Sequence, residues 1–372
     1  MAAAATTLPP TPNTGGSSNN GNNSNDNNSN SGNENNGNSG GTTASADFAL
    51  GADTSWVSEM EVAGKKFYDA NGTETDCFEL MKQYNMNAIR LRVWVNPTGT
   101  DKYCDKEHMI AKAERAHKLG MDVMVDFHYS DSWADPQKQN IPSAWKSHDY
   151  ATMKQDVADH TTDVLQGLKD KGITPKWVQV GNEISNGFLW EVGQADKNPK
   201  QYAGLFAAGY DAVKSVFPDA IVIVHLDNGY DNSLYNWNLD ILKNNGAKWD
   251  MIGMSLYPYW SLLYNNVTSA DACISQCIDN IKKVAVKYSC DVMIVETGME
   301  CGDGKGGVAS SSVLNASRDM LAKIIQQSRD NTNGYCKGVI YWEPECRPSD
   351  NYVLGAFDNS GRPTVIMDAF KE

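Results

Sequence analysis

The chain has 372 residues, 41% of them hydrophobic, and a formal net charge of −14 at pH 7. Because its 32 basic residues are dispersed along an acidic chain, a nucleic acid backbone would be repelled, and we expect no nucleic acid partner. No run of about 18 uninterrupted apolar residues occurs, so the sequence predicts no membrane-spanning helix.

The first 46 residues differ in composition from the rest of the chain. Residues 13 to 46 consist almost entirely of Asn, Gly, Ser and Thr, and the first aromatic residue is Phe48. Such a segment buries too little apolar surface to offset the conformational entropy lost on folding. We therefore predict a disordered linker over residues 1–46 and one large folded domain over residues 47–372.

In the folded domain, short apolar runs alternate with longer amphipathic segments. The segment Lys106 to Leu119 has the apolar spacing of a helix, and glycines 120, 172 and 246 can each close a helix just before the next strand. Eight such units predict an α/β fold, a (β/α)8 TIM barrel, which as a single barrel with polar outer helices needs no partner and is expected to be a monomer. The strands are expected to begin near Phe48, Ala88, Asp122, Trp177, Ile221, Met251, Val292 and Val339.

Two glutamates end predicted strands. Glu183 follows the run that starts at Trp177, and Glu296 ends the run that starts at Val292. Barrels carry their chemistry at the C-terminal ends of the strands, and two carboxylates facing one cleft are the minimum equipment for acid-assisted glycoside hydrolysis. For either glutamate alone the alternative is a helix cap or a solvated acid. Small or polar neighbours such as Asn182 let substrate come close and favour catalysis.

The second predicted strand carries two arginines, Arg90 and Arg92, between apolar residues. Since the outer wall of the barrel packs on helices, these polar side chains are predicted to point inward. An arginine inside a barrel must be paired with carboxylates or ligand. We expect Arg92, nearer the rim, to pair with one of the two glutamates. The alternative is a structural ion pair that holds the barrel floor, and for Arg90 this alternative and a role in the site are equally supported.

Further polar and aromatic residues follow the other predicted strands. Polar groups can bind sugar hydroxyls, while aromatic rings stack on the apolar face of a pyranose. Each residue alone could be a packed core side chain, but together they predict a carbohydrate-binding cleft. The residues are Asp53, Trp56, Asp126, His128, His225, Asp227, Ser255, Tyr257, Trp342 and Glu343.

The chain contains eight cysteines, an even number that would suit up to four disulfides in an oxidising compartment, although their pairing cannot be deduced. Cys273 and Cys277 lack a second Cys or His pair at a matching interval, which disfavours a metal site. The linker and the cysteines together favour a secreted, extracellular protein, either released or held at the cell surface. No export signal is visible in the first residues, which lack a basic head and an adequate apolar run.

Several segments, in order along residues 47–372, resemble glycoside hydrolase family 53, the endo-β-1,4-galactanases. The arginine-rich strand and the Asp-Phe-His-Tyr-Ser-Asp segment are specific to that family, whereas the Asn-Glu pair is shared with a wider clan of retaining barrel glycosidases. The segments are Asp47–Ser55, Ile89–Pro97, Asp126–Pro136, Val180–Ile184, His225–Asp227 and Leu354–Asn359.

The resemblance implies roles for residues at matching positions. Glu183 matches the general acid/base and Glu296 the nucleophile, while Asn182 matches the residue that binds the sugar 2-hydroxyl. Tyr257 corresponds to the tyrosine that steadies the nucleophile, and Trp342 to the ring beneath the sugar. The remaining positions expected to bind substrate are Asp53, Arg92, His128, His225 and Asp227.

The function implied is an endo-acting, retaining hydrolase of β-1,4-galactosidic bonds in galactan or type I arabinogalactan, working by double displacement. The alternatives are an enzyme of the same clan acting on mannan, xylan or β-glucan, and a non-catalytic polysaccharide-binding barrel, which would not need both carboxylates. No cofactor is required by this chemistry. Some bacterial relatives hold structural calcium near the loops after the seventh and eighth strands, and here Cys301–Gly307 offers only one carboxylate for such an ion. The loop after the eighth strand lacks a further aromatic residue, which leaves product length open.

Overall fold

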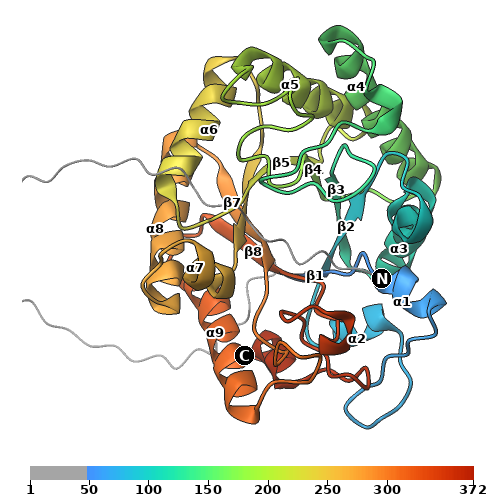
Figure 1. The fold of residues 1–372 in the computed structure, drawn as a ribbon, viewed down its shortest axis with the longest axis vertical. Coiled ribbons are helices and arrows are strands. Elements are labelled where there is room, and N and C mark those ends of the chain that lie inside the picture. Colours follow the sequence, from blue (N-terminus) through green and yellow to red (C-terminus); the bar gives the residue numbers. More distant parts are fainter. Residues whose placement is uncertain (1–47) are drawn as a thin grey trace, which may run out of the picture. The chain divides into compact units, whose positions relative to one another are not determined.

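The computed structural model describes residues 48–372, and the linker predicted over residues 1–46 lies outside them. Eight strands pair in parallel and in chain order, and the first also pairs with the last, so the sheet closes into a barrel (Figure 1). The predicted (β/α)8 barrel is therefore confirmed. The strands are β1 (Ala49–Asp53), β2 (Ala88–Val93), β3 (Asp122–Phe127), β4 (Trp177–Val180), β5 (Ile221–Leu226), β6 (Met251–Leu256), β7 (Asp291–Thr297) and β8 (Cys336–Trp342).

Five of the eight strands begin at the predicted residue, and β1 and β7 differ by a single position. The eighth begins earlier than expected, at Cys336, because Cys336 already pairs with Val292 of β7. The short segment between the helix and Val339 is thus part of the sheet.

Helices surround the barrel (Figure 1). Several start at a side-chain cap, such as Asp105, which accepts a hydrogen bond from the backbone N–H of His108. Three end before a glycine with positive φ, as predicted at glycines 120, 172 and 246. The helices are α1 (Val57–Val62), α2 (Cys77–Gln83), α3 (Lys106–Lys118), α4 (Tyr150–Asp170), α5 (Pro199–Val216), α6 (Asn232–Asn244), α7 (Pro258–Tyr264), α8 (Ala270–Tyr288) and α9 (Ser311–Asp330). None of these helices is long and apolar enough to cross a membrane.

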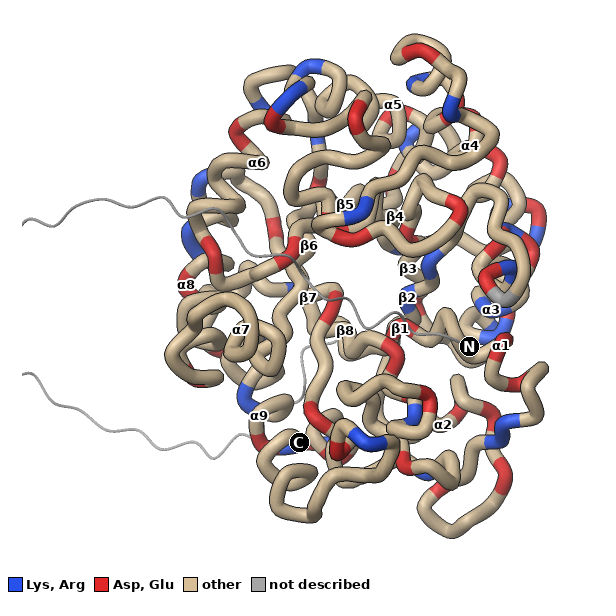
Figure 2. Tube along the Cα trace, viewed as in Figure 1, with Lys and Arg blue, Asp and Glu red and all other residues tan. Residues whose placement is uncertain are grey.

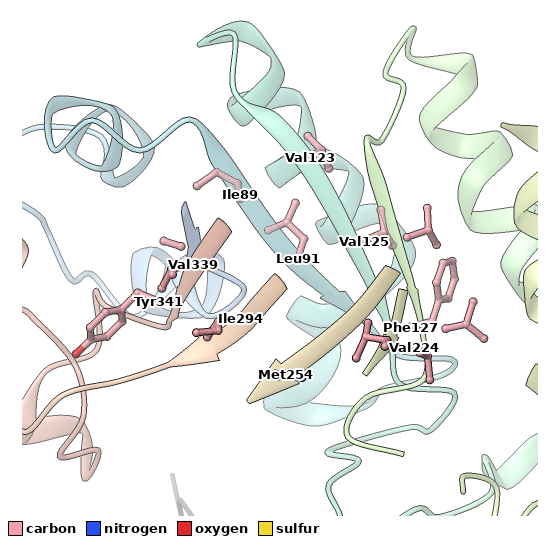
Figure 3. Close-up of a cluster of buried hydrophobic side chains, with 14 of the residues drawn as sticks. Ile89, Leu91, Val123, Val125, Phe127, Val224, Met254, Ile294, Val339 and Tyr341 are labelled. Atoms are coloured by element: carbon pink, nitrogen blue, oxygen red, sulfur yellow. The ribbon is translucent and has the colours of Figure 1, made fainter. Parts of the chain in front are cut away.

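Two separate apolar layers hold the barrel together. The outer layer lies between strands and helices and includes Ile89, Leu91 and Val125, which project from their strands in Figure 3. A smaller cluster fills the interior, with Met124 on β3 and Trp177 on β4 among its members. Because side chains on one face recur every second residue, the next inward positions on these two strands are polar, and so the apolar plug lies beneath a polar layer at the C-terminal ends.

The expected disulfides are absent. All eight cysteines lie within the described residues and all are free thiols. Seven are buried, and Cys290 is half-buried. The physical reason is that most of them, including Cys77 and Cys277, pack into the outer apolar layer, where a thiol behaves as a small hydrophobic side chain. An even cysteine count was therefore a misleading signal for this chain.

Candidate active site

Ser255 is a neighbour of both Glu183 and Glu296. Its Cα pairs with that of Glu296 across β6 and β7, and its Oγ donates a hydrogen bond of 2.6 Å to Oε1 of Glu183, just beyond β4. Glu183 and Glu296, distant in sequence, are therefore both neighbours of one serine at the C-terminal rim of the barrel. The two glutamates are close enough that, in addition to burial, the charge of Glu296 raises the pKa of Glu183.

The carboxylate of Glu296 is held by a cation and a phenol. Oε1 lies 2.9 Å from Nη2 of Arg90, and Oε2 accepts a hydrogen bond of 3.0 Å from the hydroxyl of Tyr257. Burial raises the pKa of Glu296 to about 7, although the charge of Arg90 and the hydrogen bond from Tyr257 act to lower it. Burial and the charge of Glu296 also raise the pKa of Tyr257 well above its usual value, so this phenol stays a donor.

The prediction that Arg92 would pair with one of the two glutamates was wrong. Nη1 of Arg92 instead makes a very short contact with Oε1 of Glu343, which follows β8. Its guanidinium also lies 4.3 Å from the ring centre of Trp133, within reach of a cation–π interaction. Arg90 and Arg92 lie on the same face of β2, but their guanidinium groups contact different glutamates. The arginine that supports Glu296 is Arg90.

Arg90 is the centre of a buried ion cluster. Besides Glu296 it contacts Asp53 at 2.8 Å and Asp126 at 2.9 Å, and it donates a hydrogen bond of 2.9 Å to Oδ1 of Asn182. Figure 2 shows basic positions in blue along strand β2 and acidic positions in red on neighbouring strands of the barrel. One guanidinium thus balances several carboxylates in a region with almost no solvent access, which ties their protonation states together.

Glu183 has a different environment from Glu296. Burial raises the pKa of Glu183 well above its usual value, and the nearby charges of Glu296 and Asp227 raise it further. The hydrogen bond from Ser255 acts in the opposite direction, and no cation lies against this carboxyl among the ion pairs of residues 48–372. Two glutamates in one cleft therefore differ in their readiness to hold a proton, with Glu183 the stronger holder.

The backbone at Glu183 is tightly constrained. Its φ is +46°, in the left-handed region that residues other than glycine rarely adopt. Its N–H donates to Nδ1 of His225 at 3.2 Å, and Nε2 of Gln139 donates to the carbonyl of Asn182 at 2.8 Å. These bonds, from His225 on β5 and from Gln139 in the loop after β3, constrain the backbone from which the Glu183 side chain leaves the barrel rim.

The other predicted site residues divide by exposure. Asp53 and His225 have no exposed surface, so neither side chain can contact a ligand in this cleft as it stands. Asn182 and His128 are almost fully buried; His128 donates from Nε2 to Asp126 at 2.9 Å. Asp227 is half-buried, and burial raises its pKa to about 6.

An aromatic cluster lines the rim beside β8 and β1. Trp342 lies 5.3 Å from Trp56, 5.8 Å from Trp133 and 5.0 Å from Tyr352, measured between ring centres. All four rings are half-buried, so each keeps some surface toward solvent. Trp342 is therefore part of an aromatic wall rather than a single platform.

Two buried polar residues near the site, Gln179 and Glu345, were not predicted from the sequence. Gln179 links Arg90 to His225, accepting from Nε of Arg90 at 3.3 Å and donating to Nδ1 of His225 at 2.8 Å. An uncharged polar residue in an otherwise apolar strand was the available signal. Glu345 is buried with neither carboxyl oxygen hydrogen-bonded within the described residues, and nothing in its sequence context indicated this.

Backbone hydrogen bonds engage one oxygen of the carboxylate in the segment 301–307. Its only carboxylate, Asp303, accepts hydrogen bonds of 2.8 Å at Oδ1 from the backbone N–H groups of Lys305 and Gly307. Among residues 48–372, no group of three His, Cys, Asp or Glu side chains is arranged to hold a metal ion.

A pair of carboxylates at this end of a closed parallel barrel is the site of a glycoside hydrolase. The sequence profile of Glycosyl hydrolase family 53 matches residues 49–363, and the chain belongs to that family. The endo-beta-1,4-galactanase of Bacillus subtilis (strain 168) is 32% identical over 319 residues, 81% of this chain and 71% of that protein. The arabinogalactan endo-beta-1,4-galactanase of Cellvibrio japonicus (strain Ueda107) is 33% identical over 82% of each chain. The solved GH53 catalytic domain of Ignisphaera aggregans has a TM-score of 0.78 and 28% identity, covering 89% of this chain and 97% of that one.

Proposed function

We propose that this chain is an endo-acting, retaining hydrolase of β-1,4-galactosidic bonds in galactan or type I arabinogalactan. The observation that carries the proposal is the meeting of Glu183 and Glu296 around Ser255, with only Glu296 held by a cation. Membership of family 53 and the galactanase names of the relatives support galactan as the polymer.

In the first step, ionised Glu296 attacks the anomeric carbon while Glu183 gives its proton to the glycosidic oxygen. The bond to the leaving sugar breaks as the ester bond to Glu296 forms. In the second step, Glu183, now a carboxylate, takes a proton from water, the water oxygen attacks the anomeric carbon, and Glu296 departs ionised. Two inversions give overall retention. Every step uses side chains and water alone, so we expect activity to survive chelation of metal ions.

Substrate contacts are proposed for groups that reach the cleft. The half-buried ring of Trp342 offers a face for a pyranose, and Asn182 and His128 keep a small exposed edge for sugar hydroxyls. Asp53, Arg92 and His225 are proposed to act through neighbours, since their side chains are fully or almost fully buried. A monomer suffices, because one barrel contains both carboxylates.

We also propose that the protein acts outside the cell, released or held at its surface. An endo-acting enzyme must meet a polymer that is too large to enter, which supports this location. Detection of activity in the culture medium or on intact cells, and not in the lysate alone, is the corresponding test.

The decisive experiment compares linear galactan with mannan, xylan and β-glucan, measuring reducing sugar and sizing the products. Proton NMR of the first products should show the β-anomer. Glu296→Gln and Glu183→Gln serve as matched variants, each losing one ionisable group at nearly constant size. Release of sugar from mannan or xylan but not galactan would reject the substrate. An initial α-anomer would reject double displacement.

A further inference from the structure

Behind Glu183 lies a buried pair, Ser255 and His225, that the proposed mechanism has not used. Ser255 is 2% exposed and His225 is fully buried. Nε2 of His225 lies 2.8 Å from Oγ of Ser255, and that Oγ lies 2.6 Å from Oε1 of Glu183. The three groups form a continuous chain of hydrogen bonds that ends at one oxygen of the carboxyl.

The direction of these hydrogen bonds follows from the other side of the imidazole. Nδ1 of His225 lies 3.2 Å from the backbone N–H of Glu183, which can only donate. Nδ1 must therefore carry a lone pair. The amide nitrogen of Gln179, 2.8 Å from the same atom, is placed as a second donor.

The imidazole is neutral, because burial, with smaller contributions from Arg90 and His128, lowers its pKa well below the usual value. A neutral imidazole with a lone pair on Nδ1 has its single hydrogen on Nε2, and it donates that hydrogen to Oγ of Ser255. The only hydrogen of the Ser255 hydroxyl is then directed to Oε1 of Glu183.

We propose that Ser255, oriented by His225, is a positioning residue that makes Oε1 of Glu183 a permanent acceptor and leaves Oε2 as the oxygen that delivers and takes back the catalytic proton. The inference rests on the proposed function, in which Glu183 is the acid/base. A proton on Oε1 would point at the hydroxyl hydrogen of Ser255 across a 2.6 Å contact, so the acid form carries its proton on Oε2.

The pair serves both steps without relaying a proton. Because Nδ1 of His225 is already an acceptor for the N–H of Glu183, the imidazole has no free site to take up a proton from Ser255. When Glu183 ionises, the same Ser255 hydrogen bond stabilises the carboxylate, opposing burial and the negative charges of Asp227 and Asp135, while Glu296 is by then a neutral ester. The donor is thus in place before the charge develops.

The test uses Ser255→Ala in the full chain, with kcat/KM measured on galactan and on a 2,4-dinitrophenyl β-galactobioside. The first leaving group needs a proton and the second does not. We expect a loss of about 10-fold to 100-fold on galactan, the range for a hydrogen bond to a charged group, and a loss below about 3-fold on the activated substrate. The basic limb of the galactan profile should also move to higher pH, since a donor that lowers the pKa of Glu183 is gone.

Two further variants separate positioning from folding. Ser255→Thr keeps the hydroxyl and should restore the ratio of the two rates to near the wild-type value. Ser328→Ala removes a buried hydroxyl near the C-terminal end of α9, remote from the C-terminal rim, and should leave that ratio unchanged. Equal losses on both substrates, or no loss on galactan, would overturn the inference while leaving the hydrolase assignment intact. A wild-type protein inactive on every glycan would overturn both.

Discussion

The contact between Arg90 and Glu296 predicts how activity should respond to an arginine-to-lysine change in β2. Arg90 also pairs with Asp53 and Asp126. A lysine ammonium is a compact point charge with fewer N–H donors, all on one nitrogen. In Arg90→Lys it therefore cannot keep all of these contacts. We expect it to settle among the three carboxylates, farther from Glu296 than the guanidinium was.

The size of the effect can be worked from the distance. At an effective dielectric constant of about 20, two unit charges attract by about 6 kcal/mol at the observed 2.9 Å and by about 3 kcal/mol at about 5 Å. The difference is about 2 pKa units. Water entering the vacated space weakens the interaction, so we expect the pKa of Glu296 to rise by about 1–2 units.

The proposed mechanism sets the direction in which the pH profile of Arg90→Lys should shift. Glu296 must be ionised to attack, and a raised pKa leaves more of it protonated at low pH. The acid limb of the kcat/KM profile should therefore move to higher pH by about 1–2 units when measured between about pH 4 and 9. The basic limb, set by Glu183, should move less.

Arg92→Lys is the matched control, because Arg92 lies on the same strand and face but pairs with Glu343. It should lose stability in urea unfolding, as any disrupted buried pair does, yet keep the acid limb of the wild type. If Arg92→Lys moved the acid limb and Arg90→Lys did not, the assignment of Arg90 as the partner of Glu296 would be refuted.

Three other changes have defined outcomes. Tyr257→Phe removes the 3.0 Å hydrogen bond to Glu296. We expect kcat/KM to fall by about 10-fold to 100-fold and the acid limb of its pH profile to move to higher pH. An acid limb at the wild-type pH would argue against this contact. Burial and the charge of Glu343 raise the pKa of Glu345 well above 4.5, so the native state binds the extra proton and its stability falls as pH rises above about 4.5. Glu345→Gln should therefore raise the free energy of unfolding at pH 8 by about 1–3 kcal/mol and change it little at about pH 5; a pH-independent difference in thermal melts would contradict this. Because all eight cysteines are free, eight thiols should titrate after unfolding without reductant, and a reductant should not change Tm; fewer thiols would reveal a disulfide.

The sequence by itself determined the architecture of residues 48–372. Most strands are short, largely apolar runs between longer amphipathic segments, and three helices end before a glycine, so these signals can be read locally along the chain. The same logic located Glu183 and Glu296, because the ends of parallel strands in a barrel meet at one rim.

The tertiary structure alone decided which charged groups touch. Alternation placed Arg90 and Arg92 on one face, but their partners depend on how each side chain crosses the closed barrel, and this separated Arg90 with Glu296 from Arg92 with Glu343. The hydrogen bonds from His225 to Ser255 and from Ser255 to Glu183 could not be predicted from the sequence either. They join residues of three different strands or strand ends at distances of 2.8 Å and 2.6 Å. Periodicity reports which face a residue occupies. Hydrogen bonds and ion pairs require atoms to be placed to within about a few tenths of an ångström, and that placement arises only when the eight strands close.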